Sequence, residues 1–157
     1  MRSHEPPASS GRAPAADEHF RKLERMYAAA PINAWFRPEL HVARGQAEVR
    51  LRLRPEFHHN AGATHGSLYF KALDDATFFA ANSLVDDVFV LTASFELELL
   101  RPVVDGELRA AARVTEQGEK WIAAVGELRD GEGNLVGRGR GRFARSSIAL
   151  DPSLHYQ

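Results

Sequence analysis

The sequence predicts an α+β fold in which an antiparallel sheet of about six strands wraps around one central helix. Three observations lead to this prediction. One long segment is apolar around most of its circumference at helical spacing, six segments have strand character, and four of these follow the helix without interruption. The 157 residues suffice for one core of ordinary size and are too few for two domains of typical length.

The central helix is expected from Ser67 to Leu84, and most of its surface must be enclosed. Its apolar stripe consists of Leu68, Ala72, Ala76, Phe79 and Ala80. A shorter amphipathic helix is expected to begin at Asp17, which suits an N-cap, and to end before Pro31.

The strands are expected at residues 40–44, 46–54, 88–100, 106–116, 120–129 and 135–145. Short turn segments separate the last three, which indicates an antiparallel meander. Residues 137–143 alternate glycine and arginine. One interpretation is a basic RNA-binding tract, but no aromatic residues alternate with the arginines. The favoured interpretation is a strand whose glycine face lets another backbone approach closely.

These segments divide the chain into four parts. We expect a disordered tail at 1–16, a helix and connector at 17–37, the main domain at 38–146 and a C-terminal tail at 147–157. The net charge of -1 gives no field that would attract nucleic acid or an anionic membrane, so neither is an expected partner. No segment reaches the length of a membrane span, and the expected location is the cytoplasm.

Several kinds of chemistry find no support in the sequence. The chain has no cysteine, which excludes disulfides, thiolate metal sites and a cysteine nucleophile. His58, His59 and His65, together with His41, do not have the spacing of a helical metal site, so no metal is expected. The nucleophile elbow, the phosphate-binding loop and the dinucleotide fingerprint are also missing from the sequence.

The start of the central helix is the first candidate site. His65, Gly66 and Ser67 stand where backbone N–H groups lack intrahelical partners and the helix dipole is positive. Because Gly66 has no side chain, a substrate carbonyl can reach its N–H, and this group is the candidate oxyanion donor. The alternative is that Gly66 and Ser67 only make a turn and an N-cap.

Two adjacent acids on the same helix are the second candidate. Asp74 and Asp75 interrupt an otherwise apolar segment, and one of them is suited to act as a general base on water or as a nucleophile. The alternative is a solvated stripe in which Lys71 pairs with both acids and Asn82 lies nearby.

The segment 59–67, followed by Leu73-Asp74-Asp75-Ala76, resembles the signature of hot-dog thioesterases of the phenylacetate-pathway type, within the 4-hydroxybenzoyl-CoA thioesterase superfamily. The resemblance covers about residues 40–145. It implies a hot-dog fold and hydrolysis of an acyl-coenzyme A, which is a substrate and not a cofactor. It also implies a homodimer or homotetramer with sites between subunits.

The resemblance assigns roles to particular residues. Gly66 donates the oxyanion N–H and His65 shapes the turn, whereas Asp74, nine residues after the histidine, is the base or nucleophile, with Asp75 as the fallback. Asn60 positions substrate or water. Thr92, ten residues before Pro102, has the place of a residue that orients the attacking water in some members.

Two positions depart from the family pattern. Ser67 replaces a second glycine, and Asn60 stands five residues before the histidine instead of six, a place that His59 occupies and whose role it could share. We therefore expect His59 and Ser67 to contact the substrate. Arg138 and Arg140 are candidates for the coenzyme A phosphates because a guanidinium suits phosphate.

The sequence leaves two alternative functions open. The chain could be an enoyl-thioester hydratase or dehydratase that uses His65 and Asp74, or a non-catalytic acyl-CoA binder. The acyl chain is not specified by the sequence either, since the phenylalanines around the central helix suit aromatic and aliphatic groups alike.

Overall fold

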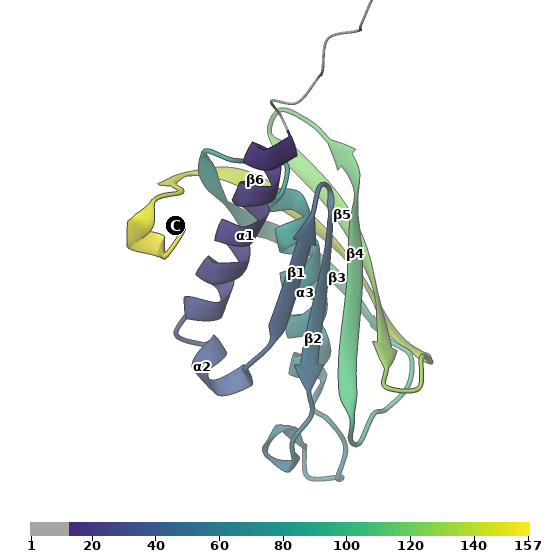
Figure 1. Cartoon of the computed structure of the whole chain (residues 1–157). Helices are drawn as coiled ribbons and strands as arrows, with labels where there is room; N and C mark the ends of the chain where they lie inside the picture. The colour runs from purple at the N-terminus through teal and green to yellow at the C-terminus, as the bar shows by residue number, and fades with distance from the viewer. Residues whose placement is uncertain (1–12) are drawn as a thin grey trace, which may run out of the picture.

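The computed structural model of this chain describes residues 13–157. It contains three α-helices, six strands and two short 3-10 helices, in the order shown in Figure 1. The elements are α1 (Ala13–Ala29), α2 (Asn33–Phe36), β1 (Glu39–Ala43), β2 (Gln46–Arg52), η1 (Pro55–Phe57), α3 (Gly66–Asn82), β3 (Val88–Leu99), β4 (Glu107–Gln117), β5 (Trp121–Asp130), β6 (Leu135–Ala149) and η2 (Pro152–Leu154).

The strands form one antiparallel sheet in the order β1-β2-β4-β5-β6-β3. β4, β5 and β6 make the expected meander, and β1 and β3 are the two edge strands. α3 connects β2 to the opposite edge strand, so it crosses one face of the sheet, and the sheet curls around it (Figure 1). The predicted fold class, a sheet around one central helix, is confirmed.

The core lies between α3 and the inner face of the sheet. Alternation in β2 turns Val49 and Leu51 inward, where both are fully buried, and leaves Arg50 and Arg52 exposed. α3 can lie close to the sheet because glycines stand beneath it. A Cβ on Gly126 would lie 3.1 Å from Leu73 Cδ2, closer than packed carbon atoms normally come.

The glycine face of β6 differs in one respect from the prediction. It mainly accommodates aromatic rings, not an approaching backbone. A Cβ on Gly139 would lie 2.5 Å from the ring of Phe95, and a Cβ on Gly141 would lie 2.5 Å from the ring of Phe143. The small residues therefore create room for large inward side chains on the same strand and its neighbour β3.

α1 begins earlier than predicted. Its first residue is Ala13 and not the residue after Asp17, because Pro14 is tolerated in the first turn of a helix. Residues 1–12 of the expected tail lie outside the described residues. Phe20, Leu23, Met26 and Tyr27 of α1 are buried, and the Tyr27 ring packs edge-on against Phe79 of α3 at 5.0 Å.

The C-terminal segment is ordered against this helix. β6 continues to Ala149, four residues beyond the predicted strand, and η2 follows. The Tyr156 hydroxyl lies 2.7 Å from His19 Nδ1, and His19 Nε2 lies 3.0 Å from the carbonyl of Asn82. The segment at 147–157 thus packs on α1. Within residues 13–157, no helix is both long and apolar enough to cross a membrane.

Candidate active site

The start of α3 is held by local hydrogen bonds. His65 is the N-cap residue, and its Nδ1 accepts the Ser67 N–H at 3.1 Å and lies 2.8 Å from Ser67 Oγ. The backbone N–H of His65 donates to the Phe57 carbonyl at 2.8 Å. Gly66 follows as the first helical residue, so its N–H has no intrahelical partner and points along the positive end of the helix dipole. This geometry suits an oxyanion.

The loop before α3 is a compact turn. The His59 N–H donates to the Ala63 carbonyl at 2.9 Å, and His59 Nδ1 accepts the Ala61 N–H at 3.0 Å. Gly62 permits the turn with a φ of 84°. His59 therefore shapes the loop, whereas the exposed Asn60 at its tip presents its amide to solvent.

Asp74 lies at the inner side of the sheet, facing the edge strand β3. Its Oδ1 accepts a hydrogen bond from Thr92 Oγ1 at 3.1 Å. Burial and, to a smaller extent, the nearby charge of Asp75 raise the pKa of the Asp74 carboxyl to about 6, although the Thr92 hydrogen bond and the charge of Lys71 act to lower it. A carboxyl group with this pKa is ionised near neutral pH yet basic enough to take a proton from water.

Asp75 has different partners. Its Oδ2 accepts hydrogen bonds from Tyr27 Oη at 2.7 Å and from Lys71 Nζ at 2.6 Å. The Lys71 and Asp75 side chains are only 11% and 19% exposed, so the alternative of a solvated stripe is wrong, although the ion pair that it included is present. Asn82, placed in that stripe, is fully buried, and its amide bonds the backbone of Val85, Val88 and Val90. Asp75 thus ties α1 to α3.

Of the two partners of Asp75, the sequence predicts Lys71 and does not predict Tyr27. The four-residue step from Lys71 to Asp75 indicated an ion pair. The bond from Tyr27 joins residues 48 positions apart, and no local spacing predicts such a contact. Burial, followed by the charge of Asp75, raises the pKa of Tyr27, so the phenol stays a hydrogen-bond donor.

Gly66 and Asp74 do not meet within one chain. They are separated by eight residues of the same helix, which corresponds to roughly 12 Å along its axis. Asn60 lies in the loop that precedes Gly66. A single chain therefore carries two separate candidate half-sites: the Gly66 N–H with the preceding loop, and Asp74 with Thr92.

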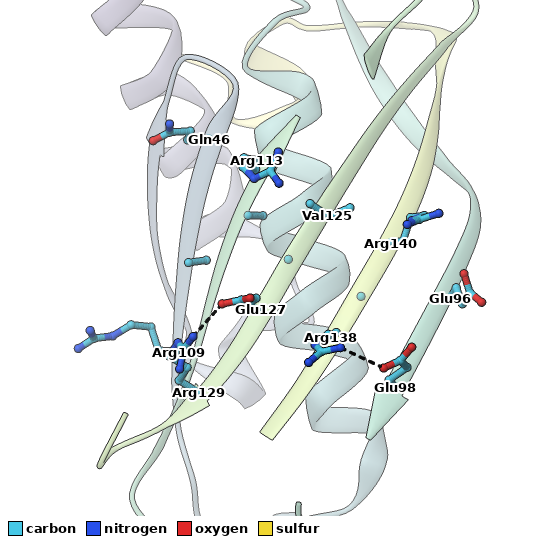
Figure 2. Close-up of a pocket in the computed structure, with 14 residues that line it drawn as sticks. Gln46, Glu96, Glu98, Arg109, Arg113, Val125, Glu127, Arg129, Arg138 and Arg140 are labelled. Atoms are coloured by element: carbon cyan, nitrogen blue, oxygen red, sulfur yellow. Dashed lines mark hydrogen bonds and ion pairs between the residues drawn. The ribbon is translucent and has the colours of Figure 1, made fainter. Parts of the chain in front are cut away.

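Arg138 and Arg140 lie apart from both half-sites. They project from the outer face of β6, and Figure 2 shows α3 behind the sheet in this view. They line a hollow of about 870 Å³ together with Arg109, Arg113, Arg129, Glu96, Glu98 and Glu127. Arg138 lies 3.9 Å from Glu98, its partner across the strands. The sheet therefore separates these arginines from Asp74 of the same chain.

A curled antiparallel sheet around one central helix is the hot-dog fold, and here it has a partly buried acid on the helix and a glycine N–H at the start of the helix. The comparison with known families agrees. The family model described as "Thioesterase superfamily" matches residues 61–137, a range that contains Gly66, Asp74 and Thr92. Over this range the chain is similar to the thioester hydrolases of this superfamily.

Known proteins share the fold at low sequence identity. The PaaI protein from the phenylacetic acid degradation operon of E. coli superposes with a TM-score of 0.78 at 20% identity, covering 85% of this chain and 97% of that one. A conserved protein of Pseudomonas aeruginosa superposes with a TM-score of 0.71 at 28% identity, covering 78% of this chain and 98% of that one. A protein of Saccharolobus solfataricus described as a candidate esterase is 23% identical over 129 residues, 82% of this chain and 89% of that protein.

Proposed function

We propose that this protein hydrolyses an acyl-coenzyme A to a free acid and coenzyme A, as a homodimer or homotetramer in the cytoplasm. The observation that carries the proposal is Asp74 on the central helix of a thioesterase fold, a partly buried carboxyl group with a pKa of about 6 that accepts a hydrogen bond from Thr92 of β3. Coenzyme A enters as part of the substrate, and the reaction as written needs no cofactor.

The two half-sites complete each other across a subunit interface. Asp74 and Thr92 of one chain act beside Gly66 and Asn60 of another, because the rise of α3 keeps the residues of one chain apart. A symmetric interface produces two such sites in each dimer.

In the proposed reaction, the thioester carbonyl accepts the Gly66 N–H, which stabilises the oxyanion as it forms. Asp74 takes a proton from water while the water oxygen bonds to the carbonyl carbon, and Thr92 holds the carboxylate in place. The tetrahedral intermediate then collapses, the C–S bond breaks, and the thiolate leaves and receives a proton. Asn60 positions the water or the substrate, with His59 supporting the loop.

Asp74 as a nucleophile is the second route, in which its carboxylate attacks the carbonyl and water later cleaves the anhydride. A single turnover in H₂¹⁸O separates the two routes. General-base catalysis puts ¹⁸O into the product acid and none into the protein. In the nucleophilic route, water that attacks the Asp74 carbonyl carbon of the anhydride leaves ¹⁸O in the Asp74 carboxyl group, so label in Asp74 identifies this route.

A panel of acyl-CoA thioesters tests the function itself. Release of free thiol supports the proposal. A hydrated product without thiol release identifies the hydratase alternative, and binding without any turnover identifies a non-catalytic acyl-CoA binder. The panel should include aryl and alkyl acyl groups, because two pairs of phenylalanines join α3 to β3, the elements that carry Asp74 and Thr92. The rings of Phe70 and Phe95 are 5.2 Å apart, and those of Phe78 and Phe89 are 5.1 Å apart.

A further inference from the structure

An aromatic and cationic cluster on α2 and η1 has no part in the chemistry assigned to Gly66 and Asp74. Trp35 is 52% exposed, and Arg54 Cζ lies 4.9 Å from the centre of its ring. The same atom lies 4.5 Å from the ring of Phe57, and Arg54 Nη2 donates to the Trp35 carbonyl at 2.5 Å. Arg54 is therefore held between two rings, and much of the Trp35 indole remains open.

The cluster is positively charged. Arg37 and Arg52 flank it in the sequence and are exposed. None of the ion pairs within residues 13–157 involves either of them or Arg54. An ordered guanidinium without a carboxylate, next to an open aromatic ring, suits a ligand that has both a planar base and phosphates.

Phe57 connects the cluster to the start of α3. Its ring packs against Trp35 at 5.9 Å and against Phe36 at 5.5 Å. Its carbonyl accepts the N–H of His65, the residue directly before Gly66. Figure 1 shows α2 and the segment that leads into α3 at the same end of the molecule. The cluster is thus adjacent to the proposed oxyanion site.

We propose that Trp35 and Arg54 bind the nucleotide end of the coenzyme A substrate. The adenine stacks on the open face of Trp35, and Arg54, with Arg37 beside it, contacts the phosphates. The pantetheine arm passes Phe57 and presents the thioester to Gly66 of the same chain. This inference rests on the proposed function. It assigns the phosphates to this cluster instead of Arg138 and Arg140, which lie on the outer face of the sheet.

The chain contains a matched control for this site. Trp121 is 40% exposed, and Arg142 Cζ lies 4.6 Å from its ring, so it repeats the tryptophan and arginine stack. It stands at the beginning of β5, where Ile122 packs with Ala81 at the C-terminal end of α3, far from Gly66. Trp121 therefore has the same arginine stack as Trp35 but does not lie near the start of α3.

A binding experiment tests the site independently of hydrolysis. The chain has two tryptophans, so Trp121→Phe leaves Trp35 as the only indole. Adenosine 3′,5′-bisphosphate should change the Trp35 fluorescence in a saturable way, pantetheine should not, and Arg54→Met should weaken the titration. A flat titration with the bisphosphate would overturn the proposal.

A kinetic experiment tests it in catalysis, with an acyl-CoA and the pantetheine thioester of the same acid. Trp35→Ala should raise KM for the acyl-CoA roughly tenfold, as loss of one stacked base predicts. It should leave kcat for the acyl-CoA and both kinetic constants for the pantetheine thioester unchanged. Trp35→Tyr, which keeps an aromatic ring, should bring KM for the acyl-CoA most of the way back to the wild-type value.

Trp121→Ala and Arg140→Met serve as controls and should leave both substrates unaffected. Equal effects of Trp35→Ala on the two thioesters, or a larger rise in KM with Arg140→Met, would contradict the inference. If the wild-type protein hydrolyses neither thioester, the proposed function fails, and the fluorescence titration still decides whether the nucleotide site exists.

Discussion

At the scale of single residues, the two adjacent acids of α3 have unlike surroundings. Asp74 faces Thr92 on an edge strand, and Asp75 is bonded to Tyr27 and Lys71. Side chains of consecutive helical residues diverge by about 100°. One acid is therefore suited to chemistry and the other to holding α1 in place.

Substitution of each acid by its amide separates these roles. Asp74→Asn keeps the shape and removes the base, so turnover should fall by ~10²-fold or more. Asp75→Asn should retain most of the turnover and instead destabilise the fold, by on the order of 1–3 kcal/mol, because the partly buried Lys71 loses the negative charge of its partner. Steady-state kinetics and thermal unfolding of both variants measure this. An inactive Asp75→Asn beside an active Asp74→Asn would reverse the assignment.

The acidity of Asp74 makes turnover depend on pH. The base must be ionised, so kcat/KM should rise with pH through about 6 and level off above it. The Thr92 hydrogen bond lowers the pKa of Asp74, and Thr92→Val should therefore move the acidic limb to higher pH. Measuring kcat/KM of the wild type and of Thr92→Val between pH 4 and 8, roughly 2 pH units on either side of the pKa, gives the acidic limb of each protein. Coincident limbs would exclude Asp74 as the titrating group.

The candidate site residues rest on different kinds of sequence argument. The start of the central helix and the family resemblance both point to Gly66, whereas the resemblance alone selects Asp74 over Asp75 and adds Thr92. The sequence does not predict the hydrogen bond from Tyr27 to Asp75, because this bond depends on the packing of α1 against α3. Arg138 and Arg140 were chosen for their charge, and only the register of β6 shows that they occupy the outer face.

At the scale of elements, the strands came out within a few residues of their predicted bounds, since period-two alternation marks a sheet with one buried face. The exceptions have physical causes. The end of β6 lacks alternation and is ordered by pairing with β3, where Val88 lies opposite Ala149. α2 is a single turn, too short to give a periodic pattern.

The start of α3 gives a prediction at this scale. Gly66→Val should abolish turnover with the fold intact, because the side chain blocks the carbonyl from the N–H. A Cβ at this position would lie 3.3 Å from Leu99 Cδ1, the end of a side chain that is 56% exposed and free to move aside. Circular dichroism checks the fold and thiol release checks turnover. A folded variant with unchanged activity would remove Gly66 from the mechanism.

At the scale of the whole molecule, β3 is an edge strand with exposed apolar residues. Leu91 is 46% exposed and Leu99 is 56% exposed, and Leu100, directly after the strand, is 43% exposed. An unpaired edge of this kind favours association with another chain. Light scattering at micromolar concentration should therefore give a multiple of the 17.4 kDa chain mass. A particle of one chain mass would contradict both the oligomer and the shared site.

The most direct test of the shared site mixes two inactive proteins. Asp74→Asn and Gly66→Val each damage a different half-site, so a dimer with one chain of each kind retains one intact site. After unfolding and refolding together, an equal mixture should recover roughly a quarter of wild-type activity, because half of the dimers are mixed and each has one of two sites. A mixture that stays inactive, although mass analysis of differently tagged chains shows mixed dimers, would contradict the account.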